Sequence, residues 1–363
     1  MRYGIPWYRV NPAPGVFDWS WTDEVLEYMV RDLGIQPIVD LVHYGCPLWL
    51  EREFVSPEYP RRVAEYARNF VERYRGLTTY YTPLNEPLVN TRFCGYTGNW
   101  PPYLRGWRGY VRVLVALAEG MSRTVAAIRE AQPGASIVHV EATSSYTTND
   151  PTLSADLEFT RRRQFLPTDL LLGWVNDEHP LKPWLLQQGA SPRTLEWLRE
   201  HPQDIELFGN NYYPGISCYR LVRKNGVATR KPYYGGIEGL EEVVRAYHER
   251  YHKPVMITES STRGPVSRRE HWMDDSLAVV RGLRAEGVPV IGYTWWPMFS
   301  LVDWQYRRGG KILGEYLVHM GLWDLRDDGT GNLRREPTRL VDKFASCVAN
   351  TEAVVGELRA IPR

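Results

Sequence analysis

Two glutamates follow apolar segments, a pattern that could place carboxyl groups at the ends of buried strands. Glu86 stands in the segment T-P-L-N-E-P at 82–87, and Glu259 stands near the end of the largely apolar segment P-V-M-I-T-E-S at 254–260. A charged side chain in such a place is costly to bury unless it faces a polar opening or has a partner. The two residues are therefore candidates for acid–base and nucleophilic chemistry.

The surroundings of each glutamate suit a different role. A partly apolar pocket would let Glu86 hold a proton near neutral pH, and Asn85 beside it offers a donor for the carboxyl or for a substrate hydroxyl. The alternative for Glu86 is to cap a helix or bond a loop. The alternative for Glu259 is a buried ion pair with Arg2 or Arg9 of the first strand, which would also keep a nucleophilic carboxylate charged.

Strand and helix patterns alternate along the chain. The expected strands are 5–10, 36–42, 79–85, 136–141, 205–212, 254–259 and 288–295, and the expected helices lie near 22–33, 57–75, 110–131, 237–250 and 268–286. Buried, β-branched strands that alternate with helices imply parallel pairing and right-handed crossovers. Either a closed barrel or an open doubly wound sheet would fit this order.

The positions of the polar and aromatic residues favour the barrel. Several strands end in such residues, namely Arg9, His43, Asn85, Asn211, Glu259 and Trp296. The carboxyl ends of all strands meet at one mouth in a (β/α)8 TIM barrel, whereas an open sheet binds its ligand mainly at one switch point. We therefore predict a single α/β domain over 1–363, with a long excursion at about 151–202. Only seven strands are found, so we expect the barrel to be incomplete at its N-terminus or one strand to be missed.

The composition excludes some classes of partner. With 44 basic and 43 acidic residues, the net charge of +1 gives no sign of a nucleic-acid or membrane partner. The 14 Trp and 23 Tyr suit the faces of sugar rings, although each could simply pack in the core. The four cysteines lie far apart, so we expect no metal site, and no cofactor is implied. Without a signal pattern or a long apolar run, we expect a cytoplasmic location.

At this point the motifs resemble glycoside hydrolase family 1, the β-glucosidase and β-galactosidase family. P-L-N-E-P at 83–87 is similar to the family's T-x-N-E-P acid/base motif, and I-T-E-S-S at 257–261 to its I-T-E-N-G nucleophile motif. Further similarities follow in the family's order at 2–10, 42–47, 211–213, 292–296 and 321–322. The resemblance therefore covers most of the chain.

The resemblance implies a role for each matching residue. Glu86 would be the general acid/base and Glu259 the nucleophile; Tyr212 would hydrogen-bond Glu259, and Arg2, now ahead of Arg9, would lie beside it. The remaining residues would bind the sugar: His43 and Asn85 through hydroxyl groups, Trp296 as a platform, Trp304 from the side, and Asp303 in the place of a family glutamate. His43 could instead be a satisfied core histidine, and Trp296 could simply fill the barrel.

The chain also departs from the family pattern. Ser260 and Ser261 replace the Asn-Gly after the nucleophile, and the family's first strand, with a sugar-binding Gln, does not precede Arg2. We expect a retaining β-glycosidase that acts on a small glycoside or oligosaccharide. In a retaining enzyme the strands of Glu86 and Glu259 would face each other, with carboxyl groups about 5 Å apart rather than the 6.5–9.5 Å of inversion. The alternatives are a non-catalytic sugar-binding barrel and a transglycosidase that uses the same two carboxyl groups.

Overall fold

The computed structural model describes residues 1–349, which form two compact units. The first unit consists of residues 1–142 and 150–209, and the second consists of residues 143–149 and the chain from 210 on. The single domain expected over 1–363 stays a prediction, and its last residues, 350–363, lie outside the described residues.

Four short parallel strands pair in chain order in the first unit. They are β1 (Arg2–Gly4), β2 (Ile38–Asp40), β3 (Tyr80–Thr82) and β4 (Ser136–Ala142). The strand expected at 5–10 is wrong, because Arg2–Gly4 forms the strand and α1 (Trp7–Val10) follows Pro6. Proline has no N–H to give to a sheet, and its fixed φ suits the start of a helix.

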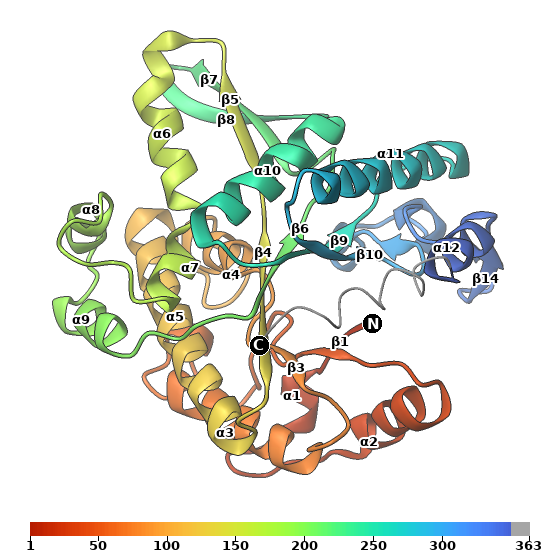
Figure 1. The fold of residues 1–363 in the computed structure, drawn as a ribbon, viewed down its shortest axis with the longest axis horizontal. Helices are drawn as coiled ribbons and strands as arrows, with labels where there is room; N and C mark the ends of the chain where they lie inside the picture. The colour runs from red at the N-terminus through yellow and green to blue at the C-terminus, as the bar shows by residue number, and fades with distance from the viewer. Residues whose placement is uncertain (350–363) are drawn as a thin grey trace. The chain divides into compact units, whose positions relative to one another are not determined.

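The long helices of the first unit agree with the expected ones in place, with shifted ends. They are α2 (Ser20–Glu27), continued by the π-helical turn η1 (Tyr28–Asp32), then α3 (Tyr59–Arg73) and α5 (Gly106–Ala131). Shorter helices are η2 (Glu53–Val55), α4 (Pro87–Asn90) and η3 (Thr91–Tyr96). Helix α3 packs against α5 (Figure 1), and a Cβ on Gly120 of α5 would lie 2.4 Å from Cε1 of Tyr59. Glycine is therefore required at this contact.

The excursion at 151–202 is helical and packs on α5. It contains η4 (Pro151–Leu153), α6 (Ser154–Arg163), α7 (Leu166–Leu171), α8 (Lys182–Gln187) and α9 (Pro192–Glu200). Leu166, Leu185 and Leu195 are buried in one cluster with Val111 and Leu114 of α5. Because burying a leucine stabilises a fold by about 1.5–3 kcal/mol relative to leaving it exposed, this cluster anchors the excursion.

Three further strands complete the strand order of the parallel sheet. Strand β6 (Leu207–Asn211) follows β4 in the sheet, and β9 (Val255–Ser260) and β10 (Val290–Trp295) come next. Helices α10 (Gly236–Tyr251) and α11 (Val266–Ala285) alternate with these strands, and Val255, Ile257 and Val290 are buried in the core of the second unit. The described residues thus contain seven parallel strands alternating with helices, which matches the expected (β/α) barrel with one strand fewer than eight.

The remaining elements belong to the second unit. A three-stranded sheet contains β5 (Ser145–Thr148), β7 (Cys218–Lys224) and β8 (Val227–Tyr233). After β10 come β11 (Leu301–Val302), η5 (Trp304–Arg308), η6 (Leu313–Tyr316), β12 (Leu317–Val318), β13 (Trp323–Asp327), β14 (Leu333–Pro337) and α12 (Leu340–Ala349). Within residues 1–349, no helix has the length and apolar character that a membrane crossing needs.

Candidate active site

Glu86 occupies a constrained turn between β3 and α4. Its amide donates to the carbonyl of Val140 at 3.1 Å, and the side chain of Asn90 donates to the carbonyls of Asn85 and Glu86. The φ of Glu86 is 48°, a left-handed conformation that costs a residue with a Cβ about 1–2 kcal/mol. The Glu86 side chain is 7% exposed, and the hydroxyl of Tyr44 donates to its Oε2. Strained backbone conformations are concentrated at functional sites, so the left-handed turn at Glu86 is consistent with a functional role.

Four polar side chains form a network next to this turn. Nη2 of Arg2 lies 2.6 Å from Oδ2 of Asp40 and 2.8 Å from Oδ1 of Asn85. Nδ1 of His43 lies 3.1 Å from the same Asp40 oxygen, and Nε2 lies 3.4 Å from Nδ2 of Asn85. The structure thus brings together three residues expected at the site, Arg2, His43 and Asn85, and adds Asp40, which contacts Arg2 and His43.

The network keeps a buried negative charge on Asp40. Burial by itself would raise the pKa of Asp40, but the charge of Arg2 and the contact with His43 outweigh it and leave the pKa lowered. An ionised Asp40 fixes both the guanidinium of Arg2 and the ring of His43. The expectation that Arg2 supports the nucleophile stays a prediction; its contacts within the first unit are with Asp40 and Asn85.

Glu259 lies in β9 of the second unit, with 4% of its surface exposed. The hydroxyl of Tyr213 donates to Oε2 of Glu259 at 2.6 Å. A charge-assisted hydrogen bond of this length holds a carboxylate in one orientation. The ring of Trp296, which follows β10, lies 5.8 Å from the ring of Tyr213 and crosses it at 71°. Glu259 and Trp296 therefore share Tyr213 as a neighbour.

The tyrosine that contacts Glu259 differs from the one expected. The expected residue, Tyr212, instead donates from its hydroxyl to the carbonyl of Gly236 at 2.8 Å and contacts Sγ of Cys218 at 3.2 Å. Only the backbone of Tyr212 meets Glu259, because its amide donates to the Glu259 carbonyl. Consecutive residues of an extended chain point to opposite sides, so when Tyr212 is buried in the core, Tyr213 turns toward Glu259.

Besides Trp296, two further residues of the expected sugar site lie after β10. Asp303 accepts the amide of Gln305 at 2.9 Å and so caps η5, the turn that contains Trp304. Trp304 is 52% exposed. The sugar-binding roles of Asp303, Trp304 and Trp296 stay predictions.

Arg9 is not placed as expected. It lies in α1 rather than at a strand end, its side chain is exposed, and its guanidinium carbon is 3.9 Å from the centre of the Trp21 ring. A cation–π contact on the surface explains this arginine. Its suggested role beside the nucleophile stays a prediction.

Three contacts were missed from the sequence, those made by Asp40, Tyr44 and Tyr213. Asp40 could have been noticed because it is a charged residue inside the expected strand 36–42, where burial demands a partner. Tyr44 directly follows His43 in the motif at 42–47, but no sequence signal shows that its hydroxyl reaches Glu86.

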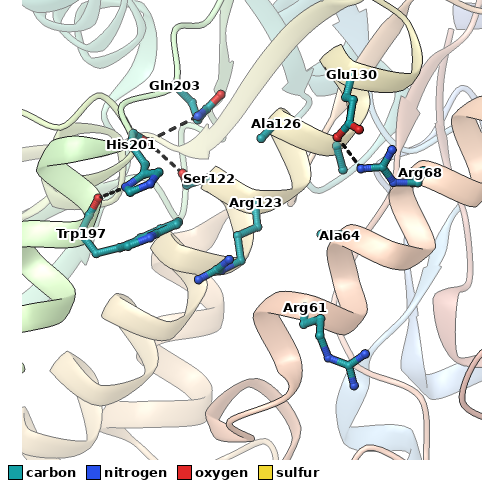
Figure 2. A pocket seen from close by; sticks show the side chains of 11 residues that line it. Arg61, Ala64, Arg68, Ser122, Arg123, Ala126, Glu130, Trp197, His201 and Gln203 are labelled. Atoms are coloured by element: carbon teal, nitrogen blue, oxygen red, sulfur yellow. Dashed lines mark hydrogen bonds and ion pairs between the residues drawn. The ribbon is translucent and has the colours of Figure 1, made fainter.

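A hollow of about 330 Å³ lies in the first unit among α3, α5 and α9, away from these residues. Figure 2 shows Arg68 paired with Glu130 on one side and Arg123 near Trp197 and His201 on the other. The arginines that line it are in ion pairs, Arg61 with Glu58, Arg68 with Glu130 and Arg123 with Glu119. None of the candidate site residues lines this hollow.

Curated relatives are similar along most of the chain, although no protein-family model matches it. The aryl-phospho-β-D-glucosidase BglH of Bacillus subtilis is 23% identical over 396 residues, which cover 96% of this chain and 81% of that protein. The aryl-phospho-β-D-glucosidase BglA of the same organism is also 23% identical, over 92% of this chain and 78% of that protein. The galactolipid galactosyltransferase SFR2 of Arabidopsis thaliana is 22% identical, over 86% of this chain and 50% of that protein.

Solved structures share the fold. The family 1 β-glucosidase from Thermotoga maritima superimposes with a TM-score of 0.81 at 18% identity, over 96% of this chain and 82% of that one. The same enzyme in complex with deoxynojirimycin gives a TM-score of 0.82, again at 18% identity over 96% and 82% of the two chains. The prediction of a (β/α) barrel, incomplete by one strand, is thus confirmed. The curated relatives and these structures thus support the resemblance of the chain to glycoside hydrolase family 1.

Proposed function

We propose that this chain is a retaining β-glycosidase, with Glu86 as general acid/base and Glu259 as nucleophile. The observation that carries the proposal is that both glutamates are buried and that each accepts a hydrogen bond from a tyrosine hydroxyl. The names of the relatives support a β-glycoside as the substrate. Residence in the cytoplasm and independence from metals and cofactors stay predictions from the sequence.

The reaction proceeds in two displacements. A carboxylate oxygen of Glu259 attacks the anomeric carbon, the bond from that carbon to the leaving oxygen breaks, and Glu86 gives its proton to that oxygen. In the second step Glu86 takes a proton from water, whose oxygen attacks the anomeric carbon and releases Glu259. Each step inverts the anomeric carbon, so the sugar leaves with its original β configuration.

The polar network of the first unit suits the sugar. His43 and Asn85 present a ring nitrogen and an amide to a ligand, and Asp40 and Arg2 hold them in place. Trp296 would offer an apolar face to the sugar ring. These binding roles are part of the proposal.

Azide tests the two roles separately. Glu259→Ala should lose activity on aryl β-glucosides and, with azide, form the α-glycosyl azide, because azide then takes the place of the nucleophile in one inverting step. Glu86→Ala should form the β-glycosyl azide, because azide then attacks the glycosyl-enzyme. Full activity of the Glu259→Ala variant, or the same azide anomer from both variants, would contradict the assignment.

Transfer to an acceptor other than water is a second candidate, favoured by the galactosyltransferase among the relatives. The same residues would act, with an alcohol or sugar hydroxyl replacing water in the second step. Product analysis at increasing acceptor concentration separates the two: a transferase forms mainly the transfer product when both acceptor and water are present. Sugar binding without any turnover would instead support the non-catalytic alternative.

A further inference from the structure

A second carboxyl group, that of Glu141, lies beside the turn that carries Glu86. Glu141 is in β4 and is fully buried. Its Oε1 accepts the amides of Ala142 at 2.8 Å and of Leu88 at 3.2 Å, and its Oε2 lies 3.3 Å from the same Leu88 nitrogen. Leu88 comes two residues after Glu86, so Glu141 bonds the first turn after the proposed acid/base.

This bond supplies what the Glu86 side chain does not. Glu86 is at the N-cap position of α4 but makes no capping bond with its own side chain. Its carboxyl instead accepts from Tyr44, while Glu141 takes the amide that an N-cap side chain ordinarily takes. The strained turn is therefore held from β4, through the Val140 carbonyl on the Glu86 amide and the Glu141 carboxyl on the Leu88 amide.

The two carboxyl groups also affect each other electrostatically. Burial raises the pKa of Glu141 well above its ordinary value and the charge of Glu86 raises it further, although the bonds from the Ala142 and Leu88 amides lower it. Two neighbouring carboxyl groups away from water resist being charged together, and such a pair keeps one proton over a wide pH range.

We propose that Glu141 is a positioning residue for Glu86: its bonds to the Leu88 and Ala142 amides fix the turn that directs the Glu86 carboxyl toward the leaving oxygen. This inference rests on the proposed function. Within the first unit, the titratable groups facing Glu86 are Tyr44, from the segment after β2, and Glu141, from β4; the network of Arg2, Asp40 and His43 adjoins it through Asn85.

The test compares two substrates that differ in how much they need an acid. Phenyl β-glucoside requires protonation of its leaving oxygen, whereas 2,4-dinitrophenyl β-glucoside leaves as a stable anion. Glu141→Ala should lower kcat/KM for the phenyl substrate by about 10-fold or more, as expected for impaired acid catalysis, and for the dinitrophenyl substrate by less than about 3-fold. Loss of a merely structural bond would lower both values by the same factor.

Glu141→Gln separates position from charge. Its amide oxygen can accept the Leu88 and Ala142 amides in the place of Oε1, so kcat/KM at the optimum pH should stay within about 3-fold of the parent chain. The ratio of the two kcat/KM values should also stay near that of the parent chain, because the turn that directs Glu86 remains bonded. This variant carries the test should the alanine variant fail to fold, which thermal unfolding of each variant reports.

The matched control is Glu206→Ala. Glu206 also bonds β4, but at its other end, where Oε2 accepts the Ile137 amide at 2.6 Å. This variant should keep the parent ratio of the two kcat/KM values. Equal losses on both substrates in Glu141→Ala, or a loss on the phenyl substrate in Glu141→Gln as large as that in Glu141→Ala, would overturn the role of Glu141 alone. Absence of turnover by the parent chain on either substrate would overturn the proposed function as well.

Discussion

The neighbouring tyrosines Tyr212 and Tyr213 allow a sharp test of the site, because the structure gives their hydroxyl groups different tasks. Tyr213→Phe removes the 2.6 Å bond to Glu259 and little else of the side chain. Hydrogen bonds to charged groups contribute about 1.5–3 kcal/mol. Since each 1.36 kcal/mol is a factor of ten in rate, kcat/KM should fall by about 10- to 150-fold.

Tyr212→Phe is the matched control. It removes a hydroxyl whose partners are the Gly236 carbonyl and Cys218, and neither of these is a candidate site residue. A buried carbonyl left without its donor costs about 1–3 kcal/mol of the free energy of unfolding. The variant should therefore be less stable in urea but keep kcat/KM within about 3-fold at a temperature where it is folded.

Both variants are measured for kcat and KM on an aryl β-glucoside and for unfolding in urea. The expected result is a crossed pattern, with Tyr213→Phe impaired in kcat/KM and Tyr212→Phe impaired in stability. The reasoning is refuted if Tyr212→Phe loses activity at full stability while Tyr213→Phe keeps it. That result would restore the assignment implied by the family motif.

Two further predictions concern stability. Asp40→Asn should lower the free energy of unfolding at pH 7 by about 3–5 kcal/mol, because the charge of Arg2 loses its buried partner. Because the pKa of Asp40 is lowered in the folded state, its charge stabilises the fold fully above the unfolded-state pKa of about 3.9. This stabilisation is lost as the pH falls through the folded-state pKa. In urea unfolding, the free energies of the parent chain and of Asp40→Asn should therefore converge in acid. Gly120→Ala should lower the melting temperature because its Cβ would meet Tyr59, whereas Gly282→Ala in α11, where a Cβ meets nothing within 4 Å, should leave it unchanged or raise it. Equal effects of the two glycine substitutions would contradict the close contact of α3 and α5.

Much of the fold could be predicted from the sequence, because most strands are apolar runs between long amphipathic segments. Strands β4, β9 and β10 lie within or next to the expected ranges. Strand β1 was misplaced because three residues are too few for an alternating pattern and the apolar residues after Pro6 form a helix. Short elements of this kind are specified by their neighbours in space rather than by their own sequence.

The candidate site was predicted in its residue types more fully than in its contacts. The motifs located Glu86 and Glu259, but a motif gives the position of a residue and not the direction of its side chain, as the exchange of Tyr212 for Tyr213 shows. Glu141 ended an expected apolar strand, as Glu259 did, and was passed over because no motif surrounds it. The cost of a buried charge applies equally to both, so the same physical rule could have identified it.

The contacts of Asp40 determine which nitrogen of His43 carries hydrogen. Because Oδ2 of Asp40 accepts from Nδ1, the neutral imidazole has its hydrogen there and keeps a lone pair on Nε2. The orientation of the Asn85 amide supports the same position of the hydrogen. Its Oδ1 accepts from Arg2, so its Nδ2 faces Nε2 of His43. A ligand hydroxyl that replaces this long 3.4 Å amide contact at Nε2 must give its hydrogen to the ring. Fluorine in place of that hydroxyl has no hydrogen to give, so fluoro and deoxy sugars altered at that carbon should bind equally poorly.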